Sequence, residues 1–411
     1  MPTGTNIRIA SARHGSNRDI SPASSAGYLY GLDALRGIAA LLVVLFHFDR
    51  WALPNLTLWP FDALIGNGYI WVDFFFILSG FVMTHVYRSS FLGGRLGTGG
   101  YREFLAARLA RIYPLHFATL MILVGLELVK LAVVMSGRAV ENQPFTDRQS
   151  LEALATNLLL MHGWNLHDDV TWNPPSWSIS AEWAVYLISP LVILALDKCG
   201  RAAGLLLAAA CVACLYVMSL GRPLELDITY DLGVVRCLLG FMIGVVLHGL
   251  YRNGLPRRAY GDTALVLATA AGLLPMALDW PDALAIPGLA AIVLIAAGNT
   301  GAGASVLRSA PLAALGRLSY SVYLSHVVIM AVLLDGWKFL YRQPFGVGFT
   351  QGQSLTALVL MVCLTLACSW VLYRLVEVPG RRLMRGWLMR RGHLPSARSE
   401  GVSGYPRTEE T

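Results

Sequence analysis

The chain has little charge for its length. Of its 411 residues, 14% are charged and 55% are hydrophobic, which excludes a water-soluble globular protein because too few polar side chains are available to cover its surface. The sequence shows no internal repeat, no glycine-rich phosphate loop and no soluble second domain. We therefore interpret it as a protein whose surface faces lipid.

Cysteine is scarce and scattered. The six cysteines lie mostly inside apolar segments, and no second pair follows Cys211 and Cys214 to complete a metal site. We interpret them as small apolar residues. His162, His167 and Asp168 have a spacing that a metal site can use, but no obvious fourth ligand accompanies them. We expect no metal.

Long apolar runs are abundant. About ten of them approach the twenty or so residues needed to cross roughly 30 Å of hydrocarbon, with short polar breaks between them. This pattern predicts an all-α, polytopic bundle of about ten transmembrane helices. The predicted helices are 32–49, 68–87, 112–136, 176–196, 202–220, 232–251, 262–278, 284–299, 315–335 and 354–374. The shorter stretch 151–162 is below spanning length and is interpreted as an interfacial or re-entrant helix.

Basic residues are concentrated on one side of this predicted bundle. The tails and loops on the side of the two termini hold 23 Lys and Arg residues, against six in the loops of the other side. By the positive-inside rule both termini are predicted to be cytoplasmic. This asymmetry explains the net charge of +7, so the charge does not indicate nucleic acid. No cleavable signal peptide is visible, and we expect a flexible cytoplasmic tail at 1–28 and a basic one at 380–411.

The first apolar run contains ionisable residues. Arg36 and His47 are eleven residues apart, which is three helical turns plus about 20°, so both project from one face, and Asp33 falls on the same side. Charged groups inside a membrane are costly, so this polar stripe predicts a wet or ligand-filled cavity. A hydrogen-bonded core histidine and an arginine anchored at the inner surface are the alternative interpretations.

Five segments carry a resemblance to a known family. They are Arg36 with His47, then 68–81, 108–114, 175–186 and 315–326. In the same order they resemble the motifs of the membrane acyltransferase 3 family, with Trp71 where Gly is usual and Ser325 where an aromatic residue is common. The resemblance implies a membrane acyltransferase domain at 29–379, and it says little about the substrate.

This resemblance implies a membrane-bound O-acyltransferase, which transfers groups other than amino-acyl groups. The implied donor is cytoplasmic acyl-CoA, with acetyl-CoA as the expected form, and the implied acceptor is a hydroxyl of an exported or cell-surface glycan. The expected location is the bacterial inner membrane, with lipid and the coenzyme A thioester as partners. Acylation of a small lipophilic molecule such as a macrolide stays open, as does a proton-coupled secondary transporter.

Acyl transfer to a hydroxyl needs a base, donors for the developing oxyanion and positive charge for the cofactor phosphates. His47 is the first candidate for the base, because an ordinary histidine pKa is near 6.5 and because the family motif includes it. Direct proton abstraction and transient acylation of His47 both stay open. Glu182 is the second catalytic candidate, since it shares a helical face with Ser178 and Tyr186. It would orient His47 or bind an acceptor sugar, unless it only locks two helices together.

Arginines on the inner side are candidates for binding coenzyme A. The loop cluster consists of Arg88, Arg95, Arg102, Arg108 and Arg111. Arginine matches phosphate groups with two parallel hydrogen bonds. We single out Arg36, Arg108 and Arg111, because these three lie in family motifs. The remaining charge is interpreted as topological or lipid-binding.

Polar and aromatic residues later in the chain are candidates for substrate binding. They are Asp73, Trp177, Ser178, Tyr323 and His326. Asp73 is expected to pair with one of the motif arginines or to cap the second helix. His326 lies at a predicted depth similar to that of His47, which suggests a shared cavity. Tryptophans near Trp177 suit a carbohydrate, although tryptophan is also enriched at membrane interfaces without a ligand, and polar side chains such as Tyr323 also join helices in lipid.

Overall fold

The structure is a bundle of helices. The computed structural model describes residues 29–94, 97–138, 140 and 142–390, and no strand occurs within these ranges. The α-helices are α1 (Tyr30–Ala52), α2 (Asp62–Gly66), α3 (Trp71–Leu92), α4 (Thr98–Met135), α5 (Leu151–Leu158), α6 (Trp177–Asp197), α7 (Arg201–Ser219), α8 (Gly233–Arg252), α9 (Asp262–Ala277), α10 (Ala285–Gly298), α11 (Ala302–Leu307), α12 (Ala310–Tyr341), α13 (Gln351–Leu372) and α14 (Val378–Arg390). The short turns are η1 (Gly68–Ile70), η2 (Asp147–Gln149), η3 (Pro174–Ser176), η4 (Arg257–Tyr260), η5 (Asp282–Leu284) and η6 (Tyr373–Glu377).

The prediction of an all-α membrane bundle is confirmed. In the described ranges, eight helices are long and apolar enough to cross a membrane, and α9 and α10 are shorter apolar helices where we predicted two more crossings. The stretch 151–162 forms only the eight-residue α5. Residues 380–390, which we assigned to the basic tail, belong to α14. The predicted tail at 1–28 and the remainder of the tail predicted at 380–411, residues 391–411, lie outside the described residues. The cytoplasmic location of the termini stays a prediction.

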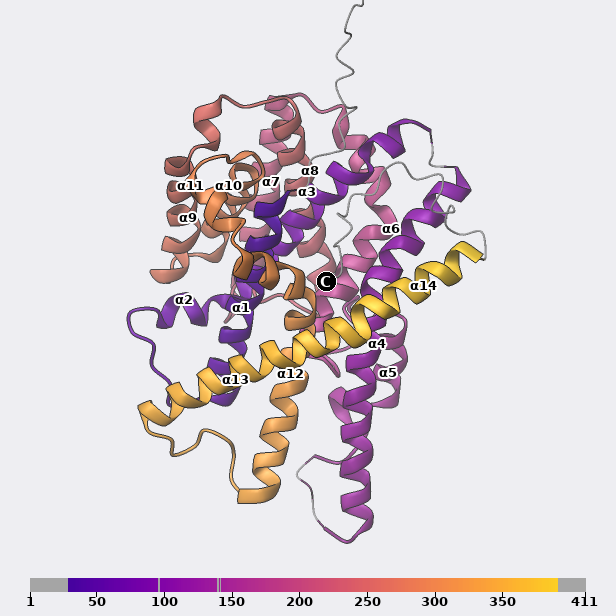
Figure 1. Ribbon diagram of the computed structural model, residues 1–411, viewed down its shortest axis with the longest axis vertical. Coiled ribbons are helices and arrows are strands. Elements are labelled where there is room, and N and C mark those ends of the chain that lie inside the picture. The colour runs from indigo at the N-terminus through magenta and orange to yellow at the C-terminus, as the bar shows by residue number, and fades with distance from the viewer. Residues whose placement is uncertain (1–28, 95–96, 139, 141, 391–411) are drawn as a thin grey trace, which may run out of the picture.

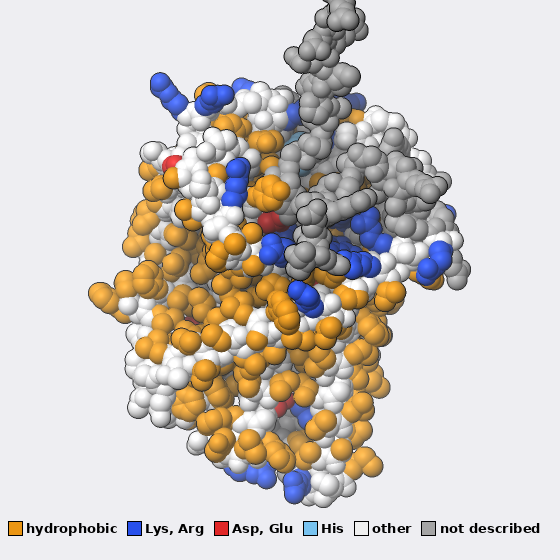
Figure 2. Space-filling model, viewed as in Figure 1, with side chains coloured by type: hydrophobic (Ala, Val, Ile, Leu, Met, Phe, Trp, Pro, Cys, Tyr) orange, Lys and Arg blue, Asp and Glu red, His pale blue; other side chains and the backbone are white. Residues whose placement is uncertain are grey.

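The outer surface of the bundle is largely hydrophobic. Figure 2 shows hydrophobic side chains over most of the middle and lower part of one face, with Lys and Arg in the upper half and at the lower rim. Leu206 is 72% exposed, Val266 67% and Leu360 64%. Side chains of this kind in such numbers are typical of a surface in contact with lipid rather than water.

The two ends of the bundle are defined by α1. In Figure 1 this helix runs from the upper part of the view toward the lower part. We call the end at which α1 begins, at Tyr30, the near end, and the end at which it finishes, at Ala52, the far end. Helix α12 runs beside α1 in the same direction, while α13 and α14 form one long rod that crosses the view diagonally (Figure 1).

Helices α1 and α12 make the most extensive helix contact in the bundle. Their backbones approach closely at Gly37 and Gly316, because a Cβ atom added to Gly37 would lie only 2.7 Å from the backbone nitrogen of Gly316. Small residues allow this approach between membrane helices. The contact brings the polar stripe of α1 against the polar face of α12, and it therefore positions the candidate site.

Candidate active site

His47 and His326 meet between α1 and α12. The Nδ1 atom of His47 lies 2.8 Å from the carbonyl oxygen of Val43 and 3.2 Å from Nε2 of His326. The Nδ1 atom of His326 lies 3.3 Å from the carbonyl oxygen of Val322. His326 is completely buried, whereas His47 is partly exposed. The structure thus brings together two of the predicted site residues from positions 279 residues apart.

The carbonyl oxygens decide where the protons of this pair sit. A carbonyl can only accept a hydrogen bond, so Nδ1 of each histidine carries the proton that faces its own carbonyl. The Nε2 atom of His326 then accepts from Nδ1–H of His47, a proton shared with Val43. Within the described residues no hydrogen bond engages Nε2 of His47. The pair therefore presents one basic nitrogen, Nε2 of His47.

Arg36 lies on the same helix toward the near end. Its Nε donates to Oγ of Ser319 at 2.8 Å, and its Nη2 donates to the carbonyl oxygen of Gly316 at 3.1 Å. The same Nη2 lies 3.0 Å from Oδ1 of Asp33, and the Arg36 side chain is 32% exposed. At 1.5 Å per residue, His47 lies about 16 Å further along α1. The stripe therefore places a fixed guanidinium toward one end and a basic imidazole toward the other.

Ser178 and Tyr323 join α6 to α12 beside His326. Their hydroxyl oxygens are 2.8 Å apart, and each hydroxyl also lies within hydrogen-bonding distance of the carbonyl oxygen of Pro175, at 2.9 Å for Ser178 and 3.2 Å for Tyr323. The ring of Tyr323 lies 6.1 Å from that of His326. These two predicted substrate residues thus fix the first turn of α6 against the histidine pair.

Glu182 is held between α3 and α6. Its Oε1 accepts from Ser79 Oγ at 2.5 Å and from Tyr186 OH at 2.6 Å. The hydrogen bonds described for Glu182 do not include one to His47, which is the partner that we considered from the sequence. In this arrangement Glu182 links two helices, and the histidine pair is oriented by backbone carbonyls instead.

Asp73 forms a buried ion pair with Arg236. The guanidinium donates through Nε to Oδ1 at 3.0 Å and through Nη2 to Oδ2 at 2.7 Å, and both side chains are almost completely buried. Arg236 also donates to the carbonyl oxygens of Tyr69 and Ile228, and it lies 5.5 Å from the ring of Trp177. We expected Asp73 to pair with a motif arginine or to cap its helix, whereas its partner is Arg236 on α8. Trp177 packs against this pair and is only 6% exposed.

The inner arginines are engaged by separate partners rather than by one another. Arg108 donates to the hydroxyl of Tyr87 at 2.7 Å. Arg111 forms an ion pair with the buried Glu377. Arg88 donates to Asp197 through Nη2 at 2.9 Å. Arg95 lies outside the described residues. The side chain of Arg36 is more exposed than that of Arg111, at 32% against 22%.

A cavity of about 350 Å³ lies between the far-end halves of α4 and α12. Figure 2 shows a hollow low on its visible face, with acidic and basic side chains inside. The residues that line the cavity include Trp51, Glu127, Lys130, Trp172, Val327 and Asp335. The ring of Trp51 lies 4.6 Å from that of His47, and Val327 directly follows His326. The cavity thus extends from the far end to the immediate neighbours of the histidine pair.

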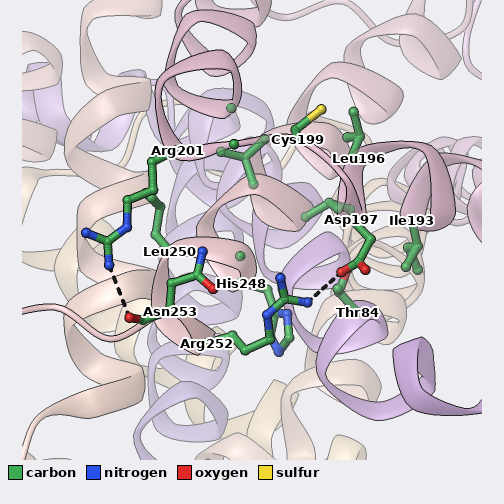
Figure 3. Close-up of a pocket in the computed structure, with 15 residues that line it drawn as sticks. Thr84, Ile193, Leu196, Asp197, Cys199, Arg201, His248, Leu250, Arg252 and Asn253 are labelled. Carbon is green, nitrogen blue, oxygen red and sulfur yellow. Dashed lines mark hydrogen bonds and ion pairs between the residues drawn. The ribbon is translucent and has the colours of Figure 1, made fainter. Parts of the chain in front are cut away.

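A second, narrower cavity lies at the near ends of α6, α7 and α8. Figure 3 shows Arg252 directed at Asp197, and Arg201 directed at Asn253. His248 also contributes to the lining. Among the described residues, no predicted site residue lines either cavity, but the far-end cavity includes Trp51 and Val327, which are next to the histidine pair, and the second cavity includes no such neighbour. We therefore place the candidate chemistry at the α1 and α12 contact.

The histidines in the loop after α5 bind hydroxyl groups. Nε2 of His162 lies 2.9 Å from Oγ of Ser176, and Nε2 of His167 lies 2.7 Å from Oγ1 of Thr156. Burial lowers the pKa of His162 to about 3. The described part of the chain contains no group of three or more His, Cys, Asp or Glu residues arranged to hold a metal ion.

Comparison with known proteins gives consistent matches. The sequence model of an acyltransferase domain family matches residues 29–374. The chain is 30% identical over 389 residues to acyltransferase MdmB of Streptomyces mycarofaciens, covering 87% of this chain and 92% of that protein. It is 23% identical over 414 aligned residues to O-acetyltransferase OatA of Staphylococcus aureus, covering 87% of this chain and 58% of that protein. No solved structure matches.

Proposed function

This chain belongs to the acyltransferase 3 family and is an acyltransferase enzyme, and from that premise we propose that it acylates a hydroxyl group of an exported or cell-surface glycan. The proposed donor is cytoplasmic acyl-CoA, with acetyl-CoA as the specific form. The proposed cellular location is the bacterial inner membrane. The observation that carries this proposal is the histidine pair. It offers one basic nitrogen next to a cavity toward the far end, on a helix that offers Arg36 toward the near end.

The proposed reaction uses Nε2 of His47 as the base. The acceptor hydroxyl gives its proton to Nε2 while its oxygen attacks the thioester carbonyl carbon. The carbon–sulfur bond then breaks, and the departing coenzyme A thiolate takes the proton from His47. During this cycle the ring is an imidazolium, and its Nδ1–H is held by the Val43 carbonyl and by Nε2 of His326. These two acceptors stabilise the charged ring and keep it in the productive orientation.

The proposed donor site uses Arg36. The extended pantetheine arm of coenzyme A separates its phosphates from its thioester, so a guanidinium and a base eleven residues apart on one helix suit the two ends of the donor. The Asp33 carboxylate and Ser319 hydroxyl fix the Arg36 guanidinium at the near end. We propose that the near end faces the cytoplasm, which agrees with the distribution of basic residues in the sequence.

A second candidate acceptor is a small lipophilic molecule such as a macrolide. It is favoured by the apolar part of the far-end cavity, where Leu123, Leu126 and Val327 lie together in the lining. The chemistry at His47 is the same for either acceptor. The two candidates differ only in what fills the cavity.

The proposed function is tested with purified protein, labelled acetyl-CoA and candidate acceptors. We expect acyl transfer in the wild type and its loss in His47→Ala. His167→Ala is the matched control, because it removes a histidine that does not line the far-end cavity. Ligand movement across proteoliposomes without an acylated product would instead support a secondary transporter and would refute the enzyme mechanism.

A further inference from the structure

Two charged residues of α4 line the far-end cavity. Glu127 is 4% exposed, and its carboxylate accepts from Nζ of Lys130 at 2.7 Å and from the backbone nitrogen of Phe145 at 3.1 Å. On the facing helix α12, an oxygen of Asp335 lies 3.8 Å from the same Nζ. Three ionisable side chains thus lie together in the lining of the cavity. Trp51 also lines the cavity, and its ring contacts that of His47.

Stability alone does not explain these three charged side chains. A buried ion pair commonly contributes no more than well-packed apolar side chains of the same volume, and charges inside a membrane helix are costly. Glu127 has a structural role, because it holds Phe145 of the loop after α4. Asp335 has no comparable structural role, because its side chain is 52% exposed and its carboxylate lies 3.8 Å from Nζ of Lys130. Asp335 and the outer side of Lys130 are therefore placed to bind a molecule in the cavity.

The charges in the cavity do not cancel. Arg148 also lines it, but this guanidinium forms an ion pair with Asp169, which is outside the lining. Lys130 offsets only one of the two carboxylates of Glu127 and Asp335. When Asp169 is counted with its partner Arg148, three carboxylates stand against two basic side chains at this cavity. One negative charge therefore remains, so the cavity repels an acidic ligand and accepts a neutral one.

Trp51 adds an aromatic surface to the charged side chains of the cavity. Its side chain is 42% exposed, it lines the cavity, and its ring contacts the ring of His47. A flat aromatic surface suits the C–H face of a sugar ring, while carboxylate and ammonium groups suit the hydroxyls at its edge. Because the Trp51 ring lies 4.6 Å from that of His47, a sugar that rests on Trp51 lies close to the histidine pair. The volume of about 350 Å³ is at the lower end of the range for small-molecule sites.

Resting on the proposed function, we propose that the far-end cavity is the acceptor site and that it selects neutral sugars over acidic ones. Trp51 stacks on the sugar ring, and Asp335 together with Lys130 binds its hydroxyls. The excess carboxylate excludes sugars that bear a carboxylate or phosphate group.

Photolabelling tests this assignment without relying on catalysis. The probes are a diazirine-bearing alkyl glucoside and the matching glucuronide, crosslinked to the full-length protein in membranes and mapped by mass spectrometry. We expect the glucoside to label segments 123–130 and 327–335, with competition by excess methyl glucoside. The glucuronide should label these segments about tenfold less, as expected for one like-charge contact.

Charge variants make the test specific. Asp335→Lys should reverse the preference, with more labelling by the glucuronide than by the glucoside. Asp168→Lys is the matched control, because Asp168 is an exposed carboxylate of a far-end loop outside the cavity lining, and it should leave the preference unchanged.

The outcomes separate the two proposals. Labelling of the cavity with reversal by Asp335→Lys, but without acyl transfer by the wild type, keeps the sugar site and overturns the proposed function. Acyl transfer with labelling elsewhere, or with a preference that Asp335→Lys does not change, overturns the sugar site alone. Absence of competable labelling also counts against the sugar site.

Discussion

Replacement of His326 tests the division of labour within the histidine pair. In His326→Leu, Nδ1–H of His47 keeps the Val43 carbonyl at 2.8 Å but loses the acceptor at 3.2 Å. A hydrogen bond to a charged group is worth about 1.5–3 kcal/mol. The lost bond is the longer of two that share one proton, so we take the lower value, about 1.5 kcal/mol, which corresponds to a roughly tenfold fall in the rate of acyl transfer.

The comparison with His47 makes this magnitude informative. Loss of a general base lowers a rate by roughly a hundredfold to ten-thousandfold, so His47→Ala should be far more damaging than His326→Leu. His326→Gln retains an oxygen that accepts from Nδ1–H and should recover much of the rate. The assay is single-turnover transfer of a labelled acetyl group, with thermal unfolding as the control for folding. Equal losses in His47→Ala and His326→Leu, or no loss in His326→Leu, would refute the assigned roles.

Three further predictions concern the donor site, the buried ion pair and a loop histidine. Arg36→Ala should raise the Kd for coenzyme A by about tenfold, through loss of a charge-assisted contact, and equilibrium binding with unchanged affinity would remove Arg36 from the site. Asp73→Asn should lower the free energy of unfolding by about 3–5 kcal/mol because it leaves Arg236 buried and without its counter-charge, and a variant as heat-stable as the wild type would contradict this. For His162, burial lowers the pKa to about 3, whereas the unfolded chain binds the proton below about pH 6.5. The folded state is thus stable above pH 6.5 and loses stability as the pH falls below it, so thermal unfolding of His162→Gln should depend less on pH between 6.5 and 4; equal slopes would be the opposing result.

Helical periodicity predicted the faces of the helices well. The eleven-residue step from Arg36 to His47 puts both on one side of α1, and both indeed contact α12, at Ser319 and at His326. The reason is that a helix repeats every 3.6 residues whatever surrounds it, so residues that share a face can be read from local spacing.

Partners across helices could not be predicted in the same way. Asp73 and Arg236 are 163 residues apart in the chain, and Arg111 and Glu377 are 266 apart. Local spacing does not determine which helix packs on which. A charged residue inside an apolar run therefore predicts that a partner exists, but not which residue it is. Arg236 is such a case, because it is an arginine inside the apolar helix α8 and only the structure identifies Asp73 as its partner.

The far-end cavity was also beyond the reach of the sequence. It is formed where the far-end halves of α4 and α12 and the loop that contains Trp172 come together. Hydropathy also places the start of α4 at residue 112, whereas the helix begins at Thr98, because the polar residues before 112 lower the local average. Apolar content thus marks the part of a helix that suits lipid, not the part that forms hydrogen bonds.

The close approach of Gly37 and Gly316 bears on how the membrane stays sealed. At this contact the two backbones leave no room for a side chain or for a column of water between α1 and α12. Ions therefore have no path between the two helices at this point. If donor and acceptor meet at His47 from opposite ends, only the small acyl fragment changes sides. The cell would then acylate a molecule on its outer side without opening a channel through the membrane, and its proton gradient would be maintained.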